Sequence, residues 1–358
     1  MTDEDRLTDL LLEWESRDPG TETDPETFCA KHGAADLAAS FRRLLEGLGA
    51  VGLSASKTEP NQPANVPVDF EAGRYRAESV LGQGGLGVVF RATDVELDRP
   101  VALKRLHAGD LAFDRFVFEA RLTGRLEHPG VVPIYGLVAN RQNEVCYAMR
   151  LISGVTLNDA IAKLHERHGA DEPLPFLSSE MRWLLRAFVT ACETIAYAHS
   201  KQVLHRDIKP QNIMLGEFGE CLVIDWGLAR VISAAESSGD PHLDVLRKQL
   251  AEGYEQTIAG QAKGTWAYMA PEQARGEWDQ VGPASDIFSL GGTLYKLATG
   301  KSPYHGPFDP EAVRNGRFPP PRQVNPEIPK PLEAVILKAM AANPGDRYSD
   351  ARDFAQDV

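Results

Sequence analysis

The residue types best suited to chemistry in this chain of 358 residues lie in two short stretches that read HRDIKPQN and DWG. The first contains Asp207, Lys209 and Asn212, and the second begins with Asp225, thirteen residues after Asn212. A carboxylate can orient a hydroxyl and accept its proton, an ammonium can offset phosphate charge, and amide and carboxylate oxygens can hold Mg²⁺. An isolated His-x-Asp triplet would mean little. The complete string, with a second acidic loop after a predicted strand over 222–224, indicates metal-dependent phosphoryl transfer.

A glycine-rich stretch lies upstream, where residues 81–90 read LGQGGLGVVF. This glycine spacing also fits a dinucleotide-binding turn, in which the glycines open a helix. Residues 88–90 instead continue an extended, β-branched run. The pattern therefore favours a strand-turn-strand hairpin whose backbone N–H groups cover phosphates, because glycine allows the close approach. About fifteen residues further on, the run VALK ends in Lys104.

These motifs together resemble the eukaryotic-type (Hanks-type) protein kinases, and specifically the serine/threonine branch, in which a lysine two residues after the catalytic aspartate is characteristic. The resemblance covers about residues 74–358. It implies an α+β, two-lobed protein kinase fold with a small β-rich lobe over 74–149, a hinge over 150–154 and a large helical lobe over 155–358. It also implies an ATP-dependent enzyme that phosphorylates serine and threonine in proteins during signal transduction.

The resemblance assigns four catalytic residues. Asp207 orients the substrate hydroxyl, Lys209 neutralises γ-phosphate charge and Lys104 tethers the α- and β-phosphates. Glu119 falls in a segment of helical spacing, where the family supplies the partner of that lysine. A glutamate on a surface helix is ordinarily just solvated, so its assignment depends on its register with Lys104 and with the His-Pro pair at 128–129 that ends the helix.

The resemblance also implies a nucleotide and metal site. Asn212 and Asp225 are expected to hold Mg²⁺, with Mn²⁺ as an alternative ion. The residues expected to line the ATP site are Gly82, Gln83, Gly84, Gly85, Gly87, Val89, Ala102, Lys104, Met149, Leu151 and Met214.

One departure from the family pattern is Trp226, which replaces the usual phenylalanine in the metal-binding triplet. The family residue packs against helix αC and helps to set active or inactive geometry, so a bulkier indole is expected to bias that equilibrium. A buried indole N–H also requires a hydrogen-bond acceptor. The DWG variant resembles kinases of some bacterial groups, Planctomycetes in particular.

A second departure is the length of the activation segment, with an insertion at about 233–256. Leu243, Leu246 and Leu250 have helical spacing within it. A surface insertion and a regulatory helix that docks on the kinase or a partner are both consistent with this pattern.

Arg206 stands where related kinases contact a phosphate on the activation segment. Thr257 is the expected site of that phosphate, which autophosphorylation would supply. Thr265 is a second candidate, although its expected family role is to hold Asp207 and Lys209 in place.

Landmarks of the large lobe follow. Residues 264–272 read GTWAYMAPE and resemble the loop that docks a peptide substrate. With Lys209, this loop disfavours a kinase of small molecules. Asp286 and Arg347 match two buried structural charges, and the family pairs the arginine with the glutamate that is here Glu272.

The main alternative is a nucleotide-binding scaffold, held inactive by the packing of Trp226 or by the insertion. Inactive relatives usually lack one of the charged or metal-binding groups. This chain keeps Lys104, Asp207, Asn212 and Asp225, and losing any of them would cost orders of magnitude in rate. The sequence therefore favours an active enzyme.

Composition limits the class of protein. A net charge of −13 argues against nucleic acid as a partner. The four cysteines lack metal or disulfide-framework spacing, which fits a reducing compartment. No apolar run is long enough to span a bilayer, so no membrane contact is expected from this chain. The expected location is cytoplasmic, although the chain stops inside the last helix of the resemblance and relatives often continue into a membrane span and a sensor domain.

The region before the kinase-like part has a different character. Residues 1–53 predict an acidic helical extension, with Leu7, Leu10, Leu11 and Trp14 on one apolar face, a helix start at Asp24, and a second stripe that includes Leu37 and Phe41. Residues 54–73 read as a flexible linker. These helices are too few for a core of their own, so they are expected to form an ordered appendage, to self-associate or to dock on a partner.

Overall fold

The structure is a computed structural model. It describes residues 24–32, 34–38, 42, 70–84, 87–106, 110–140, 144–168, 178–232, 266–306 and 309–358. The chain divides into two compact units, residues 1–66 with 83–85, and residues 67–82 with 86–358. In this described part, no helix is both long and apolar enough to cross a membrane.

In the first unit, the described elements are α2 (Pro25–Lys31) and the 3-10 turn η1 (Ala35–Leu37). The predicted helix start is confirmed, because the backbone N–H of Thr27 donates to Asp24 Oδ1 at 3.1 Å. Leu37 is buried, but it lies in the 3-10 turn. Phe41 and the predicted first helix lie outside the described residues.

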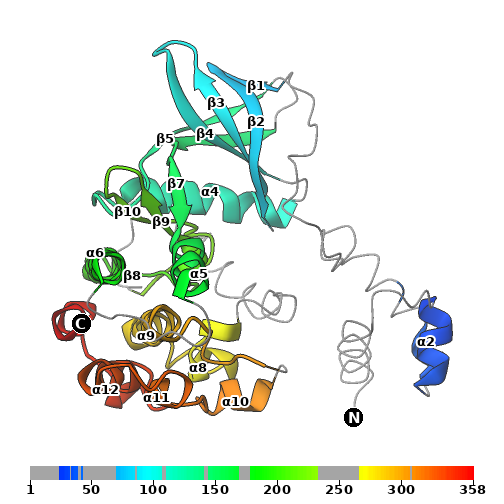
Figure 1. The fold of residues 1–358 in the computed structure, drawn as a ribbon. Coiled ribbons are helices and arrows are strands. Elements are labelled where there is room, and N and C mark those ends of the chain that lie inside the picture. The colour runs from blue at the N-terminus through cyan, green and yellow to red at the C-terminus, as the bar shows by residue number, and fades with distance from the viewer. Residues whose placement is uncertain are drawn as a thin grey trace. The chain divides into compact units, whose positions relative to one another are not determined.

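The small lobe is a six-stranded sheet in the order β1-β2-β3-β4-β6-β5 (Figure 1). Its strands are β1 (Glu71–Ala72), β2 (Tyr75–Gly84), β3 (Gly87–Asp94), β4 (Arg99–Leu106), β5 (Ile134–Ala139) and β6 (Val145–Arg150). The helix predicted to carry Glu119 is present as α4 (Asp110–Arg125), and it lies against β4 and β5. β2 and β3 are neighbours, which confirms the predicted hairpin, although residues 85–86 at its turn lie outside the described part.

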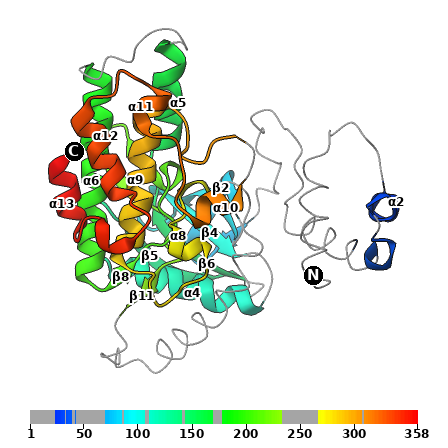
Figure 2. The same cartoon turned by 90° about the horizontal axis from the view of Figure 1, so that it is seen from below.

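The large lobe is helical. The helices among its described residues are α5 (Leu157–His168), α6 (Ser179–Ser200), α8 (Pro271–Ala274), α9 (Pro283–Thr299), α10 (Pro310–Arg314), α11 (Pro321–Val324), α12 (Lys330–Ala339) and α13 (Ala351–Asp357). The described part of this lobe also contains the 3-10 turns η2 (Pro210–Asn212), between β8 (Val203–Leu204) and β9 (Ile213–Gly216), η3 (Trp266–Tyr268), before α8, and η4 (Pro344–Asp346), between α12 and α13. α9 contacts α6, α12 and α13 and is buried along most of its length (Figure 2).

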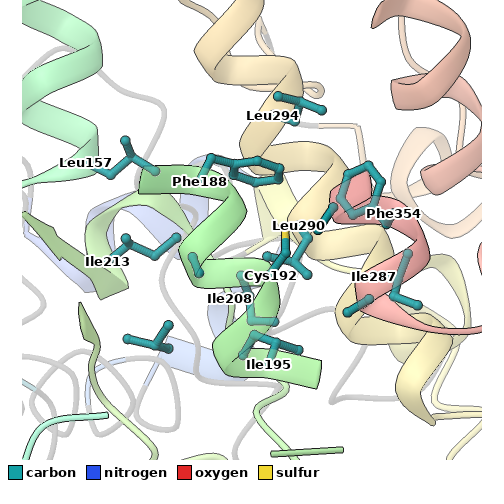
Figure 3. Packing of buried hydrophobic residues seen from close by; sticks show 14 of the residues in the cluster. Leu157, Phe188, Cys192, Ile195, Ile208, Ile213, Ile287, Leu290, Leu294 and Phe354 are labelled. Atoms are coloured by element: carbon teal, nitrogen blue, oxygen red, sulfur yellow. The ribbon is translucent and has the colours of Figure 1, made fainter. Parts of the chain in front are cut away.

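The main core lies between α6, α9 and α13 (Figure 3). Apolar residues recur at helical spacing on α6, so that Phe188, Cys192 and Ile195 share its inner face. The ring of Phe188 meets that of Phe354 edge to face, with centroids 5.8 Å apart. Ile208 and Ile213, within and directly after the HRDIKPQN string, belong to this core.

Short strands connect the lobes and frame the charged loops. β7 (Gly154–Thr156), β9 (Ile213–Gly216) and β10 (Cys221–Val223) form one antiparallel sheet, and β8 (Val203–Leu204) pairs with β11 (Arg230–Val231). The strand predicted over 222–224 is thus one residue earlier, since the chain turns before Asp225. Residues 151–153 join β6 to β7, while Arg150 and Gly154, the outer residues of the predicted hinge, end and begin those strands.

Candidate active site

The loop between β8 and β9 carries the HRDIKPQN string, and Asp286 of α9 holds its backbone by hydrogen bonds. The Asp286 carboxylate accepts the backbone N–H of His205 at 2.9 Å and that of Arg206 at 2.8 Å. His199 of α6 contacts the same carboxylate through Nε2 at 2.8 Å. Burial would raise the pKa of Asp286, but the two histidines outweigh that effect and lower it. The prediction of a buried structural charge is confirmed.

Asp207, Lys209 and Asn212 form one hydrogen-bonded cluster on this loop. Lys209 Nζ lies 2.9 Å from Asp207 Oδ2, and Asn212 Nδ2 donates to the backbone oxygen of Asp207 at 2.8 Å and to its Oδ2 at 3.1 Å. Lys209 has an extended backbone, and the 3-10 turn η2 that begins at Pro210 brings the amide back toward the carboxylate. Burial raises the pKa of Asp207, and the nearby charge of Asp225 adds to this rise against the opposing effect of Lys209.

Asp225 lies next to this cluster because the chain leaves β10 there. The N–H of Ile224 donates to the backbone oxygen of Asn212 at 2.9 Å, which joins the two predicted metal-binding segments. Asp225 has a left-handed φ of 62° and an exposed side chain. Desolvation by the surrounding protein would raise its pKa, but Lys104, His205 and Lys209 outweigh it and lower the pKa. The carboxylate is therefore anionic and accessible.

Trp226 points the opposite way, into the protein, with 1% of its surface exposed. Its Nε1 donates to the backbone oxygen of Val223 at 3.2 Å, so the predicted acceptor is present. The indole lies 4.6 Å from the His205 ring and belongs to the same buried cluster as Phe118 and Leu122 of α4. This cluster extends over much of the large lobe, so the packing of the indole directly against the helix that carries Glu119 stays a prediction.

We expect Trp226→Phe to weaken folding while leaving phosphoryl transfer within about tenfold of wild type. The smaller ring leaves a cavity and an unpaired Val223 oxygen, which together should cost about 1–3 kcal/mol of unfolding free energy in urea titrations. Asp225 would be unchanged, and the family usually has phenylalanine at this position. Loss of turnover in a folded variant would instead show that the indole is required for the geometry of the loop.

A second set of charged side chains, the pair formed by Lys104 and Glu119, links β4 to α4. Lys104 Nζ contacts Glu119 Oε1 at 2.7 Å, across fifteen positions of sequence, so the predicted pair is present. Burial would lower the pKa of Lys104, but Glu119 and Asp225 outweigh it and raise it, which keeps the ammonium charged. Both side chains are largely withdrawn from solvent, with 12% and 3% exposed.

Two contacts of α4 were not predicted from the sequence. Tyr147 of β6 donates its hydroxyl to Glu119 Oε1 at 2.7 Å. Arg115 Nε donates to the backbone oxygen of Gly227, two residues after the predicted metal ligand Asp225, at 2.9 Å. The one available signal was that a tyrosine within a buried strand requires a polar partner for its hydroxyl.

The residues predicted to line the ATP site are spread over several strands of the small lobe. Val89 is opposite Lys104, and Ala102 is opposite Met149. Because opposite partners and alternate residues share a face, these four residues lie on one face of the sheet. The other predicted residues are placed in β2 (Gly82, Gln83, Gly84), in β3 (Gly87), directly after β6 (Leu151) and in β9 (Met214).

Glycine is required at position 87 because the backbone of β4 passes too close to leave room for a side chain. A Cβ at this position would lie 2.0 Å from the backbone oxygen of Arg105 on β4.

Some of the predicted features lie outside the described residues. They are Gly85, Thr257, Thr265 and the 233–256 insertion.

A buried ion pair joins α8 to the residue that follows η4 in the large lobe. Arg347 Nη1 and Nη2 contact Glu272 Oε1 and Oε2 at 2.7 and 2.8 Å, and neither side chain is exposed. Ser285 Oγ donates to the same carboxylate at 2.6 Å. The predicted pairing is confirmed.

Comparisons with known proteins agree with this geometry. Residues 75–357 match the protein kinase domain family. The chain is 35% identical over 313 residues to the serine/threonine-protein kinase PknD of Protochlamydia amoebophila, and 36% identical over 293 residues to PknD of Chlamydia pneumoniae. These alignments cover 84% and 80% of this chain but 31% of each relative, so the chain spans about a third of their length.

Solved structures show the same fold at low sequence identity. The Mycobacterium tuberculosis PknI kinase domain matches with a TM-score of 0.55 at 22% identity, over 81% of this chain and 97% of that one. The twitchin kinase region of C. elegans matches with a TM-score of 0.62 at 23% identity, over 84% of this chain and 48% of that one. With the family match over most of the chain, these findings show that the chain belongs to the protein kinase domain family, as a bacterial Hanks-type kinase.

Proposed function

We propose that this chain is a serine/threonine protein kinase that transfers the γ-phosphate of ATP to protein hydroxyls. The observation that carries the proposal is the cluster of Asp207, Lys209 and Asn212, joined to Asp225 through the Ile224–Asn212 backbone bond. This arrangement sets a carboxylate, an ammonium and two oxygen ligands side by side. The names of the PknD relatives support the same activity.

In this proposal, Asp207 orients the hydroxyl of the substrate. Its Oδ2 already accepts from Lys209 and Asn212, so Oδ1 is the oxygen that would accept the hydroxyl proton. Lys209 Nζ lies 2.9 Å from the same carboxylate, so its ammonium would be near the transferred phosphate. There it would offset the negative charge of the γ-phosphate. Lys104, held by Glu119, would contact the α- and β-phosphates.

The donor set fits Mg²⁺. The amide nitrogen of Asn212 is engaged by Asp207, which leaves the amide oxygen for a cation, and the Asp225 carboxylate is exposed. Among the residues that the structure describes, no cluster of three or more His, Cys, Asp or Glu side chains could hold a metal alone. Mg²⁺ commonly combines one or two protein oxygens with substrate phosphates, so the two residues suffice with ATP present, and Mn²⁺ could replace it.

The nucleotide would lie against the sheet face that carries Val89, Ala102, Lys104 and Met149. The glycine-rich hairpin would cover its phosphates, because backbone at glycine can approach them closely. Gly82, Gln83, Gly84, Gly85 and Gly87 on this hairpin, with Leu151 and Met214, complete the proposed nucleotide site.

We further propose control by autophosphorylation at Thr257, read by Arg206, with Thr265 supporting the catalytic loop. Arg206 is 8% exposed and lies directly before Asp207, so a phosphate bound there would act on the catalytic loop. The DWG triplet supports a relationship to planctomycete kinases. Peptides of the active enzyme should carry phosphate on Thr257.

The predicted linker over 54–73 is too long at its end, because Glu71 and Ala72 form β1 of the small-lobe sheet. The proposed organisation is therefore residues 1–53 as a helical extension that self-associates or docks on a partner, 54–69 as a linker, and a kinase domain that begins just before β1 rather than at residue 74 and runs to residue 358. We also propose that the substrates are proteins and that nucleic acid is not a partner. A cytoplasmic location is also proposed, since the four cysteines, all free and buried, fit a reducing compartment.

The activity is tested by intact mass. Purified protein is treated with phosphatase and incubated with Mg²⁺ and ATP beside an Asp225→Ala control. We expect added phosphates in the wild type alone, because the variant lacks a metal ligand. No added mass on the wild type or on an added protein substrate, with ATP still bound, would contradict the proposed activity.

A further inference from the structure

Glu119 receives a second hydrogen bond besides that of Lys104. The Tyr147 hydroxyl and Lys104 Nζ each lie 2.7 Å from the same oxygen, Glu119 Oε1. The other oxygen, Oε2, is buried and makes no hydrogen bond in the described part of the chain. The orientation of this carboxylate therefore depends on two donors at a single atom.

Tyr147 also contacts both elements that this ion pair joins. It is opposite Lys104 in the β4–β6 register, with Lys104 Nζ 5.7 Å from its ring centroid. Its ring lies 4.9 Å from that of Phe116 on α4 and forms a small buried cluster with Phe116 and Ala120. At 3% exposure, the side chain is closed off from solvent.

We propose that Tyr147 is a positioning residue for the Lys104–Glu119 pair. Its ring packs on α4 while its hydroxyl orients the Glu119 carboxylate, so that Lys104 Nζ is held where the phosphates of a nucleotide would lie. If α4 moved away from the sheet, a buried hydroxyl and a buried carboxylate would both lose a partner, which disfavours that movement. This inference rests on the proposed role of Lys104 in ATP binding.

Tyr147→Phe tests the hydroxyl, because it keeps the ring and its contact with Phe116. We expect KM and the calorimetric Kd for ATP to rise about tenfold, with kcat changed less, since a hydrogen bond to a charged group is lost. Amides of α4 should exchange hydrogen faster in the nucleotide-free protein.

The matched control is Tyr295→Phe. Tyr295 is a buried tyrosine of α9 whose hydroxyl donates to the backbone oxygen of Pro319 at 2.9 Å. This variant also loses one tyrosine hydroxyl bond, but in the large lobe. It should leave the KM for ATP and the exchange of α4 unchanged even if its stability falls.

A double-mutant cycle with Glu119→Gln, read as the Kd for ATP, tests the route of action. If Tyr147 acts through Glu119, adding Tyr147→Phe to Glu119→Gln should change Kd by less than twofold. Full additivity, or wild-type KM and α4 exchange in Tyr147→Phe, would overturn the inference. Wild-type protein that binds ATP without transferring phosphate would contradict only the proposed activity, because the Kd and exchange comparisons would still stand.

Discussion

Asp207→Asn is expected to lower kcat by about 10²- to 10⁴-fold while the Kd for ATP changes little. The amide matches the carboxylate in shape but cannot take a proton from the substrate hydroxyl. Asp207 lies on the loop held by Asp286, so the backbone should keep its position. The measurements are steady-state phosphorylation of a protein substrate and calorimetric titration with ATP.

Asp353→Asn is a suitable control, because Asp353 is an exposed carboxylate on α13 and should leave both quantities unchanged. A parallel loss of ATP binding in Asp207→Asn would contradict the assigned role, since that result would indicate a group that holds the nucleotide. Unchanged turnover would exclude Asp207 as the residue that orients the hydroxyl.

Glu272→Gln is expected to reduce the free energy of unfolding at pH 7 by about 3–5 kcal/mol. The change leaves the Arg347 guanidinium buried without its anionic partner, although Arg347 keeps hydrogen bonds to the backbone oxygens of Ala284 and Ala341. Urea unfolding of the two proteins measures the difference. Glu277→Gln, which removes the partner of Arg275 in a pair with 33% and 37% exposure, should have a far smaller effect.

The stabilising effect of Glu272 should also depend on pH. Burial would raise the pKa of Glu272, but Arg347 and Ser285 outweigh it and lower the pKa. A carboxyl whose pKa is lowered by folding adds stability above the pKa of the unfolded chain, about 4.3, and loses it as pH falls through the folded value. The gap between wild type and Glu272→Gln should therefore be full at pH 6–7 and shrink below about pH 4. A gap that stayed constant down to pH 3 would contradict this account.

Much of the candidate site could be predicted because its residues are close together in sequence. Asp207, Lys209 and Asn212 lie on one short loop, and their spacing already limits how far apart their side chains can be. Lys104 and Glu119 are on neighbouring elements, so their pairing could be inferred from the resemblance. A buried indole N–H needs a hydrogen-bond acceptor, so the sequence also predicted that Trp226 would have one. It did not identify the acceptor as the backbone oxygen of Val223.

The sequence by itself determined the family, the charged groups of the loop and the hairpin, because these follow from residue types at short, regular spacing. The tertiary structure decided which distant groups support them. Tyr147 contacts Glu119, and Asp286 holds the loop that contains Asp207, only because strands and helices far apart in the chain pack together. The physical reason is that a buried polar group must find a partner, but which partner it finds depends on packing rather than on local pattern.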